Sequence, residues 1–267
     1  GTTADKISTT GSIVLRPTTT SQTVGIGDTA VGTFDLDVAE IAALTGYSSL
    51  TIGASGNTGA VDVQTITLEG TTTIYGGTVT VNGTLNTSGS NYALTIGGNL
   101  TIAGTLTANA STITVSGNWD SSNGVYTPGT STVTFNGSAQ TISGTTTFYH
   151  LSVSSTTQLD IASVTVSCYD LTINANGKLR LDNALDDLNV TGAKIIVSAN
   201  GTFEVSDGDI DVSADGLQNS GMFTMSGGTL DTYSWLYNYA STATMNISGG
   251  ILNIDRFPNY YGVVNHS

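Results

Sequence analysis

The chain has 267 residues, with 20 acidic and 6 basic residues and a formal net charge of −14. This charge argues against nucleic-acid binding, which needs a basic surface to displace counterions from phosphate. The sequence has no apolar run of about 18 residues, so it predicts no membrane-spanning helix. Its one cysteine, Cys168, excludes an intramolecular disulfide, and we expect it to be a small half-buried residue.

One short helix is predicted, over residues 37–46. Asp37 has the features of an N-cap, because a glutamate follows three residues later, and a glycine ends the segment. On a helix, Ile41 and Leu44 share one face with Val38. We expect this helix to lie across the first coils of the fold, where it hides the open end of the core.

The segment before this helix carries apolar residues in a polar context, namely Ile7 and the run Ile13, Val14 and Leu15. We hypothesise that residues 1–15 add a strand to the sheet edge of a neighbouring molecule. Pairing of this segment with its own coils would refute the hypothesis.

Short apolar–polar–apolar triplets recur along the rest of the chain, separated by turns rich in glycine and asparagine. Between Leu94 and Leu188 they recur every 17 to 20 residues. Strict alternation is typical of a strand with one face on the core and the other in solvent. Examples are Leu50-Thr-Ile, Val79-Thr-Val, Leu94-Thr-Ile, Ile113-Thr-Val, Leu188-Asn-Val, Phe223-Thr-Met and Met245-Asn-Ile.

A period near 20 residues indicates stacked coils, since one coil cannot bury its apolar face alone. We predict an all-β fold, a parallel β-solenoid of about ten coils in which each triplet pairs with the triplet one coil on. An antiparallel sandwich is the alternative. We expect one continuous domain with an N-terminal cap at 1–60, regular coils at 61–232 and aromatic terminal coils at 233–267.

Two groups of charged residues stand in the second half of the chain. Lys178 and Arg180 alternate with leucines and therefore line one outward face. Asp207, Asp209 and Asp211 likewise alternate along one face, and carboxylate oxygens are the ligands that Ca²⁺ prefers. Their spacing is not that of a calcium loop, so a solvated acidic face is the simpler interpretation and calcium the alternative.

The last 35 residues are rich in aromatic side chains. Alternation places the first four on one face, but it leaves open whether that face packs in the core, contacts another subunit or binds sugar. We predict an interface here, because a solenoid end stacks on more of the same chain or on another copy. The candidate residues are Tyr233, Trp235, Tyr237, Tyr239, Phe257, Tyr260 and Tyr261.

Two stretches resemble known bacterial surface proteins. The first, which includes Ser12-Ile-Val-Leu-Arg-Pro17 and Phe34-Asp-Leu-Asp-Val-Ala-Glu-Ile, resembles a module of large secreted adhesins of the filamentous-haemagglutinin type. The second, Ser131-Thr-Val-Thr-Phe-Asn-Gly-Ser-Ala, resembles repeats of outer-surface β-helix proteins. The resemblance implies a right-handed β-helix with a structural or adhesive role outside the cell, and it carries no catalytic residues.

We therefore expect a non-enzymatic structural protein located outside the cell or on its surface. It would be a filament or sheath subunit, or a segment of a giant adhesin, and it would associate with itself end to end. The alternative is a carbohydrate-binding or polysaccharide-processing β-helix protein, in which Lys178 and Arg180 meet carboxylates in a groove or aromatic rings contact glycans. A phage or viral fibre segment is a third interpretation.

Overall fold

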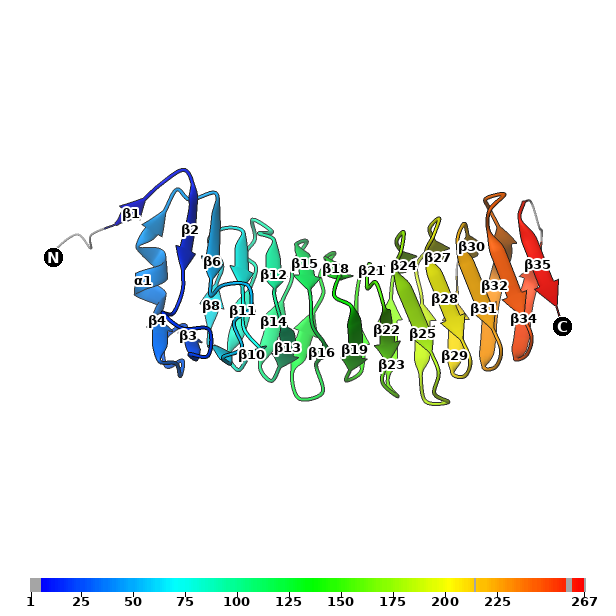
Figure 1. Ribbon diagram of the computed structural model, residues 1–267, viewed down its shortest axis with the longest axis horizontal. Coiled ribbons are helices and arrows are strands. Elements are labelled where there is room, and N and C mark those ends of the chain that lie inside the picture. Colours follow the sequence, from blue (N-terminus) through cyan, green and yellow to red (C-terminus); the bar gives the residue numbers. More distant parts are fainter. Residues whose placement is uncertain (1–5, 214, 258–260, 267) are drawn as a thin grey trace. The chain divides into compact units, whose positions relative to one another are not determined.

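The computed structural model describes residues 6–213, 215–257 and 261–266. It is an all-β parallel β-solenoid of about ten turns, which confirms the predicted fold class (Figure 1). The chain divides into two compact units, Gly1–Ser131 and Thr132–Ser267. In each unit, successive turns add strands to three parallel sheets, called here the first, second and third sheets in the order in which a turn visits them.

Each of the three sheets of the N-terminal unit is built from strands of successive turns. The first sheet consists of β2 (Ser12–Leu15), β6 (Ser49–Ile52), β9 (Thr72–Ile74), β12 (Leu94–Ile96) and β15 (Thr112–Val115). The second consists of β4 (Phe34–Leu36), β3 (Val24–Ile26), β7 (Val61–Val63), β10 (Thr78–Val81), β13 (Asn99–Ile102) and β16 (Trp119–Asp120). The third consists of β8 (Ile66–Thr67), β11 (Thr84–Asn86), β14 (Thr105–Thr107) and β17 (Val125–Thr127), while β1 (Ile7–Ser8) pairs separately with β5 (Leu44–Thr45).

The C-terminal unit repeats this plan, and its long strand β32 (Thr229–Asn238) belongs to two sheets. The first sheet holds β18 (Thr132–Phe135), β21 (His150–Val153), β24 (Asp170–Ile173), β27 (Lys194–Val197), β30 (Gly216–Asn219) and the end of β32. The second holds β19 (Ala139–Ser143), β22 (Gln158–Ile161), β25 (Lys178–Leu181), β28 (Thr202–Val205), β31 (Met222–Met225), β33 (Thr244–Ile247) and β35 (Val263–His266). The third holds β20 (Thr146–Thr147), β23 (Thr165–Cys168), β26 (Asp187–Val190), β29 (Asp209–Val212), the start of β32 and β34 (Ile251–Arg256).

The pairing register corrects the predicted repeat. Leu94 does pair with Ile113 in the first sheet, but Leu188 pairs with Ile210 in the third and Phe223 pairs with Met245 in the second. The triplets in the sequence therefore belong to three different sheets rather than to one series. Strands of all three sheets have the same short alternating pattern. The sequence alone therefore does not show which triplets belong to the same sheet, and it suggests one triplet per coil.

The inward side chains form a continuous apolar interior within each unit. Leu94 and Ile113 in the N-terminal unit are fully buried, as are Phe203 and Phe223 in the C-terminal unit. The rings of Phe203 and Phe223, one turn apart, lie 5.6 Å between centroids. Because each turn places an apolar side chain directly above the last one, burial depends on neighbouring turns and not on any single turn.

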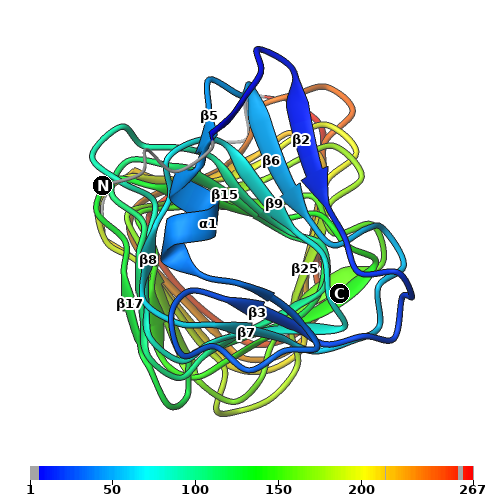
Figure 2. The same ribbon diagram turned by 90° about the vertical axis from the view of Figure 1, so that its left-hand side faces the viewer.

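The predicted helix forms, but it is shorter than expected. Helix α1 spans Val38–Ala42, and Asp37 and Glu40 make the predicted capping box, with Asp37 Oδ1 accepting from the Glu40 backbone N–H at 2.6 Å. Leu44 belongs instead to β5, and Val38 is exposed, so the predicted shared face is wrong for Val38. Figure 2 shows α1 across one end of the coils of this unit. Ile41 is buried there and lines the same interior space as Leu50 and Leu85, as a cap requires.

One corner of the C-terminal unit is held by a tyrosine stack that needs a glycine. The rings of Tyr149 and Tyr169 are parallel within 6° and 4.8 Å apart. A Cβ on Gly192, one turn further on, would lie 2.0 Å from the Tyr169 ring, so glycine is required there for steric reasons. The adjacent His150 Nδ1 lies 2.8 Å from Asp170 and ties the same two strands together.

Candidate functional site

The N-terminal segment is folded onto its own coils. Ile7 pairs with Leu44, and β2 pairs in register with β6, so that Ile13 lies beside Leu50 and Leu15 beside Ile52. The hypothesis that residues 1–15 add a strand to a neighbouring molecule is therefore wrong for the described part of this segment, because that strand already has a partner in its own chain. Ile7 and Val14 point outward and are exposed, while Ile13 and Leu15 are half-buried.

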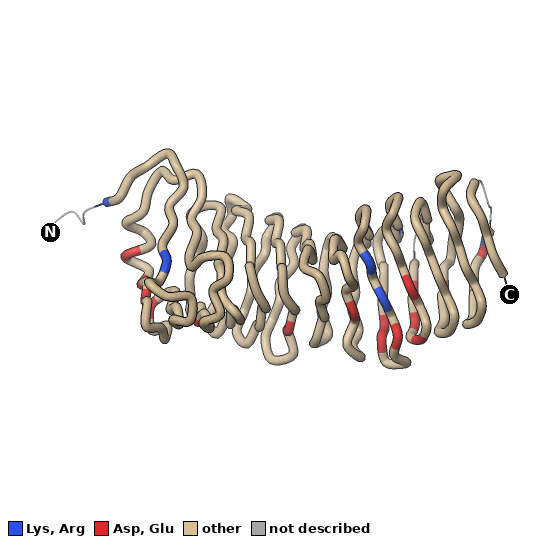
Figure 3. Tube along the Cα trace, in the orientation of Figure 1, with Lys and Arg blue, Asp and Glu red and all other residues tan. Residues whose placement is uncertain are grey.

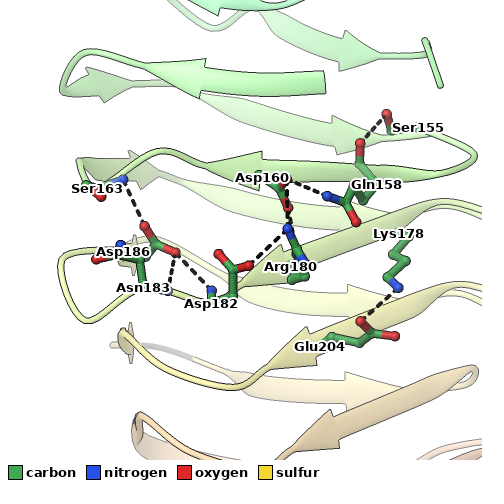
Figure 4. Close-up of polar contacts among 10 residues, drawn as sticks. All are labelled: Ser155, Gln158, Asp160, Ser163, Lys178, Arg180, Asp182, Asn183, Asp186 and Glu204. Carbon is green, nitrogen blue, oxygen red and sulfur yellow. Dashed lines mark hydrogen bonds and ion pairs between the residues drawn. The ribbon is translucent and has the colours of Figure 1, made fainter. Parts of the chain in front are cut away.

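Lys178 and Arg180 lie on the outward face of β25, as predicted, and both contact carboxylates there (Figure 4). Arg180 Nε and Nη2 donate to the two oxygens of Asp160, at 2.9 and 3.2 Å, and Nη2 also lies 2.9 Å from Asp182. Lys178 Nζ lies 2.8 Å from Glu204 on the next turn. Figure 3 shows basic and acidic positions close together in the C-terminal unit.

This ion-pair network has a structural explanation. The register places Asp160, Arg180 and Glu204 side by side on three successive strands, so opposite charges alternate along the sheet. Hydrogen bonding to Asp160, followed by the nearby carboxylates, raises the pKa of Arg180 further above its usual range. Both cations are thus held by carboxylates on adjacent strands, Arg180 by its ladder neighbour Asp160 and Lys178 by the diagonal neighbour Glu204, an arrangement typical of structural ion pairs.

A buried carboxylate supports the corner next to this network. Asp186 is 1% exposed and accepts hydrogen bonds from three backbone N–H groups, those of Ser163, Asp182 and Asn183, at 2.9 to 3.1 Å. These donors come from two successive turns. Asp186 therefore fixes the corner that follows β25, and Figure 4 shows the contacts.

The acidic face predicted around Asp209 and Asp211 is present on the third sheet of the C-terminal unit. Asp209 lies beside Asp187, and Asp211 lies beside Asp231, so like charges are neighbours in the ladder. Burial, followed by repulsion from Asp231, Asp187 and Asp209, raises the pKa of Asp211.

Asp207 does not belong to that face. It lies in the corner before β29, where its carboxylate accepts from the Gly208 N–H at 2.9 Å. Within the described residues, no three His, Cys, Asp or Glu side chains are grouped so that they could hold a metal ion. Asp207, Asp209 and Asp211 as a calcium site stays a prediction.

The aromatic residues of β32 point outward, so they do not pack in the core, while a subunit contact and sugar binding both stay predictions. Leu236 and Asn238 face inward and are buried, whereas Trp235 and Tyr237 are half-buried on the outer surface. The register shifts between Thr232 and Trp235, where the strand passes from the third sheet to the first. This shift separates Tyr233, which is 71% exposed, from the aromatic residues that follow.

The residues after the shift line a surface hollow of about 440 Å³ in the C-terminal unit. Its walls come from β27, the segment before β30, β32 and the segment before β35. The lining residues are Lys194, Asp215, Trp235, Tyr237, Tyr239 and Tyr261. We call this the aromatic hollow. Of the other predicted interface residues, Tyr233 lines a separate hollow beside Asp231, Phe257 is exposed after β34, and Tyr260 lies outside the described residues.

Sequence reasoning missed the polar half of the aromatic hollow. Lys194 Nζ and the Tyr237 hydroxyl both donate to Gln218 Oε1, each at 3.0 Å. Lys194 is 41 residues before Trp235 in the sequence, but the ladder brings Gly216 beside Lys194 and Gln218 beside Tyr237. The register between successive coils would have predicted these contacts, but the spacing of the triplets alone does not give that register.

Cys168 is fully buried and faces the interior with Val166, which makes it more buried than expected. Burial, followed by the charge of Asp170, raises the pKa of its thiol well above the usual range. A thiol with a raised pKa is a poor nucleophile, because the thiolate is the reactive form.

The chain matches no protein-family model, no curated protein and no solved structure. The fold is consistent with β-helix repeat proteins, while the resemblance to large adhesins stays a prediction. In the part of the chain that the structure describes, no helix is long and apolar enough to cross a membrane.

Proposed function

We propose that this protein is a non-enzymatic structural or adhesive β-solenoid that works outside the cell. It serves as a filament or sheath subunit, or as one segment of a giant surface adhesin, and it continues end to end into further solenoid coils. The observation that carries the proposal is the incomplete burial of inward-facing side chains on the outermost strands.

In the C-terminal unit this exposure lies on β34 and β35. Leu252 pairs with Leu230, and Val264 pairs with Met245; the inner partner of each pair is fully buried, while the outer residue is only half-buried. Ile254, which follows the same inward row, is also half-buried. A further coil stacked here would bury these side chains and pair the edge strands.

In the N-terminal unit the same change occurs on β2. Ile13 and Leu15 are half-buried, whereas their partners Leu50 and Ile52 are 2% exposed. Each unit therefore has an outermost strand whose core side chains lack full cover, although α1 covers the interior near Ile41 in the N-terminal unit. An end that joins a different end, without closing into a ring, produces an open filament.

Three observations favour a structural role over an enzymatic one. Lys178 and Arg180 are held in ion pairs on a regular sheet, and Cys168 is a buried thiol with a raised pKa. The remaining outward residues of the regular turns are mostly threonine, serine and asparagine, which favour ladder pairing more than acid–base chemistry. The polysaccharide-processing alternative therefore has less support than the structural one.

The end-to-end contact is tested with two variants of β35, one with a lysine on the inward face of the strand and one with a lysine on its outward face. Val264→Lys puts an ammonium group on the inward face of β35, and the control Val263→Lys puts it on the outward face, where Val263 is 53% exposed. We expect wild type and Val263→Lys to form higher oligomers in sedimentation velocity, and Val264→Lys to form none. A wild-type chain that remains monomeric at high concentration, or equal effects of both lysines, would contradict a filament built from copies of this chain.

The location is tested on cells of the source. An antibody against the folded protein should label intact cells without permeabilisation. Labelling only after permeabilisation would contradict an extracellular role.

A further inference from the structure

The aromatic hollow has the size and composition of a ligand site. Its volume of about 440 Å³ lies within the usual range for small-molecule pockets, roughly 300 to 1,000 Å³. All its walls belong to the C-terminal unit, and its floor is the first sheet. Four of its six lining residues are aromatic.

Three outward rings stand in succession at the end of β32, Trp235 and Tyr237 on the strand and Tyr239 directly after it. Tyr237 and Tyr239 lie 6.3 Å between ring centroids at an interplanar angle of 73°, so the two rings face different directions and form a concave wall. Trp235 is covered on one face by the guanidinium of Arg256, 4.9 Å from the ring centroid. That cation–π contact holds the indole in place at the edge of the hollow.

A glycine allows β32 to pack closely against the strand beside it at Trp235. Gly216 pairs with Lys194, and its φ of +77° is one that other residues seldom adopt. A Cβ there would lie 1.9 Å from the Trp235 carbonyl oxygen. Because Gly216 has no side chain, the backbone of β32 can lie close to it at Trp235, on the strand next to the one that carries Lys194.

The polar groups of the hollow are fixed in position before any ligand arrives. Gln218 Oε1 accepts a hydrogen bond from Lys194, whose ammonium group carries three N–H donors, and another from the Tyr237 hydroxyl, which it orients. Asp215 adds a carboxylate on the same wall. The hollow thus combines ring faces with a donor and an acceptor, which is the combination needed to hold a molecule with an apolar face and many hydroxyls.

The charges narrow the class of ligand. One lysine and one aspartate leave the lining close to neutral, and the net charge of −14 repels polyanions at long range. A cationic ligand is disfavoured because Lys194 lines the hollow and Arg256 already occupies one face of Trp235. An uncharged molecule fits best.

We propose that the aromatic hollow is a binding site for uncharged pyranose sugars, with the rings of Trp235 and Tyr239 contacting the apolar faces of the sugar rings and Lys194 and Asp215 hydrogen-bonding their hydroxyls. The proposal goes beyond a structural role and does not depend on end-to-end assembly. It supplies a chemical target for adhesion.

The test uses tryptophan fluorescence, because the chain has only two tryptophans and Trp119 is fully buried in the N-terminal unit. The probes are cellohexaose, mannohexaose and chitohexaose, with oligogalacturonate as the anionic comparison, and calorimetry confirms each affinity. We expect at least one neutral probe to change the Trp235 emission and to bind more tightly than oligogalacturonate.

The matched variants are Tyr239→Ala and Tyr233→Ala, two exposed tyrosines near each other in the sequence, of which only Tyr239 lines the hollow. Tyr239→Ala should weaken binding about tenfold, as expected for the loss of one aromatic contact, and Tyr233→Ala should leave it within about twofold. No binding by any neutral probe, equal losses in both variants, or preference for oligogalacturonate would overturn the proposal.

Two further measurements separate this proposal from end-to-end assembly. Val264→Lys should keep full affinity for the sugar even where it abolishes oligomers. If Tyr239→Ala instead abolishes oligomers and no sugar binds, the hollow is an interface between copies and the sugar proposal is wrong.

Discussion

Two outward faces of the C-terminal unit place their charges in opposite ways. On the second sheet, Asp160, Arg180 and Glu204 alternate in sign from one strand to the next. On the third sheet, Asp211 lies beside Asp231, and their like charges repel. Glu204 and Asp211 lie on the same turn, so the difference comes from which residues the coil register makes neighbours on each sheet.

This contrast shows that a strand's own pattern determines which face a side chain takes, but not which charge it meets. The partner of an outward residue lies one turn away, and turns differ in length: Leu94 and Ile113 are 19 positions apart, while Leu171 and Ile195 are 24 apart. Which outward residues become neighbours therefore depends on the length of each turn, which the strand pattern does not give.

The largest loss of stability is expected when like charges become neighbours on the second sheet, as they already are on the third. Arg180→Glu should lower the free energy of unfolding by about 2 kcal/mol, because two charge-assisted hydrogen bonds to Asp160 are replaced by repulsion. Arg180→Met, which keeps the aliphatic stem, should cost roughly half as much. Urea denaturation measures both, and equal losses would show that charge order does not matter here.

Asp62 accepts several hydrogen bonds, and the pH dependence of its contribution to stability should be opposite to that of Asp211. In the N-terminal unit, burial acts against the charged form of Asp62, but donors from Asn82, the Val31 N–H and Gln64 outweigh it and lower its pKa. Its contribution to stability is therefore complete above the unfolded-state pKa, near pH 4, and is lost as the pH falls through the lower folded-state pKa. Asp62→Ala should cost about 1 kcal/mol at pH 7.

The check is the same urea series repeated at decreasing pH. The difference between wild type and Asp62→Ala should shrink only in strongly acidic solution. A difference that stays constant with pH would mean that packing, and not the ionised carboxylate, accounts for the loss.

A smaller effect is expected for the ion pair between Lys178 and Glu204 on the second sheet. Lys178→Met should lower stability by about 0.5 kcal/mol, because Lys178 and Glu204 are partly exposed and solvent screens their attraction. The loss should decrease as sodium chloride is raised from 0.05 to 1 M. A loss that does not depend on salt would instead point to the packing of the lysine stem.

The smallest expected effect is a gain in stability. Asp211→Asn should raise stability by a few tenths of a kcal/mol at pH 7, because it removes repulsion from Asp231 and Asp187. The raised folded-state pKa means that the folded chain takes up this proton first, so wild type gains stability as the pH falls and the gap to Asp211→Asn closes. A gap that widens in acid would contradict the like-charge ladder.

The sequence was sufficient to predict the fold class and the inward rows of side chains, because alternation and periodicity are local signals. It also predicted the helix cap at Asp37, the outward faces of Lys178 and Arg180, and the aromatic cluster in β32. It did not show that three sheets share the triplets, because strands of all three have the same apolar pattern. Lys194 and Gln218 were missed since their relation to Tyr237 depends on the exact length of each turn.

The N-terminal strand was misassigned for a related reason. Ile13 and Leu15 have the pattern of a strand that adds to a sheet, and β2 is such a strand, but the sheet is its own. Sequence alternation cannot distinguish a partner within the chain from one outside it.

The central claim is that these solenoid units continue end to end into a longer structure. Negative-stain electron microscopy of the material as isolated from its source tests it most directly, because both a filament of copies and a giant adhesin extend far beyond one chain. We predict continuous fibres with a width that does not change along their length. Separate particles with the mass of a single 267-residue chain would contradict the account.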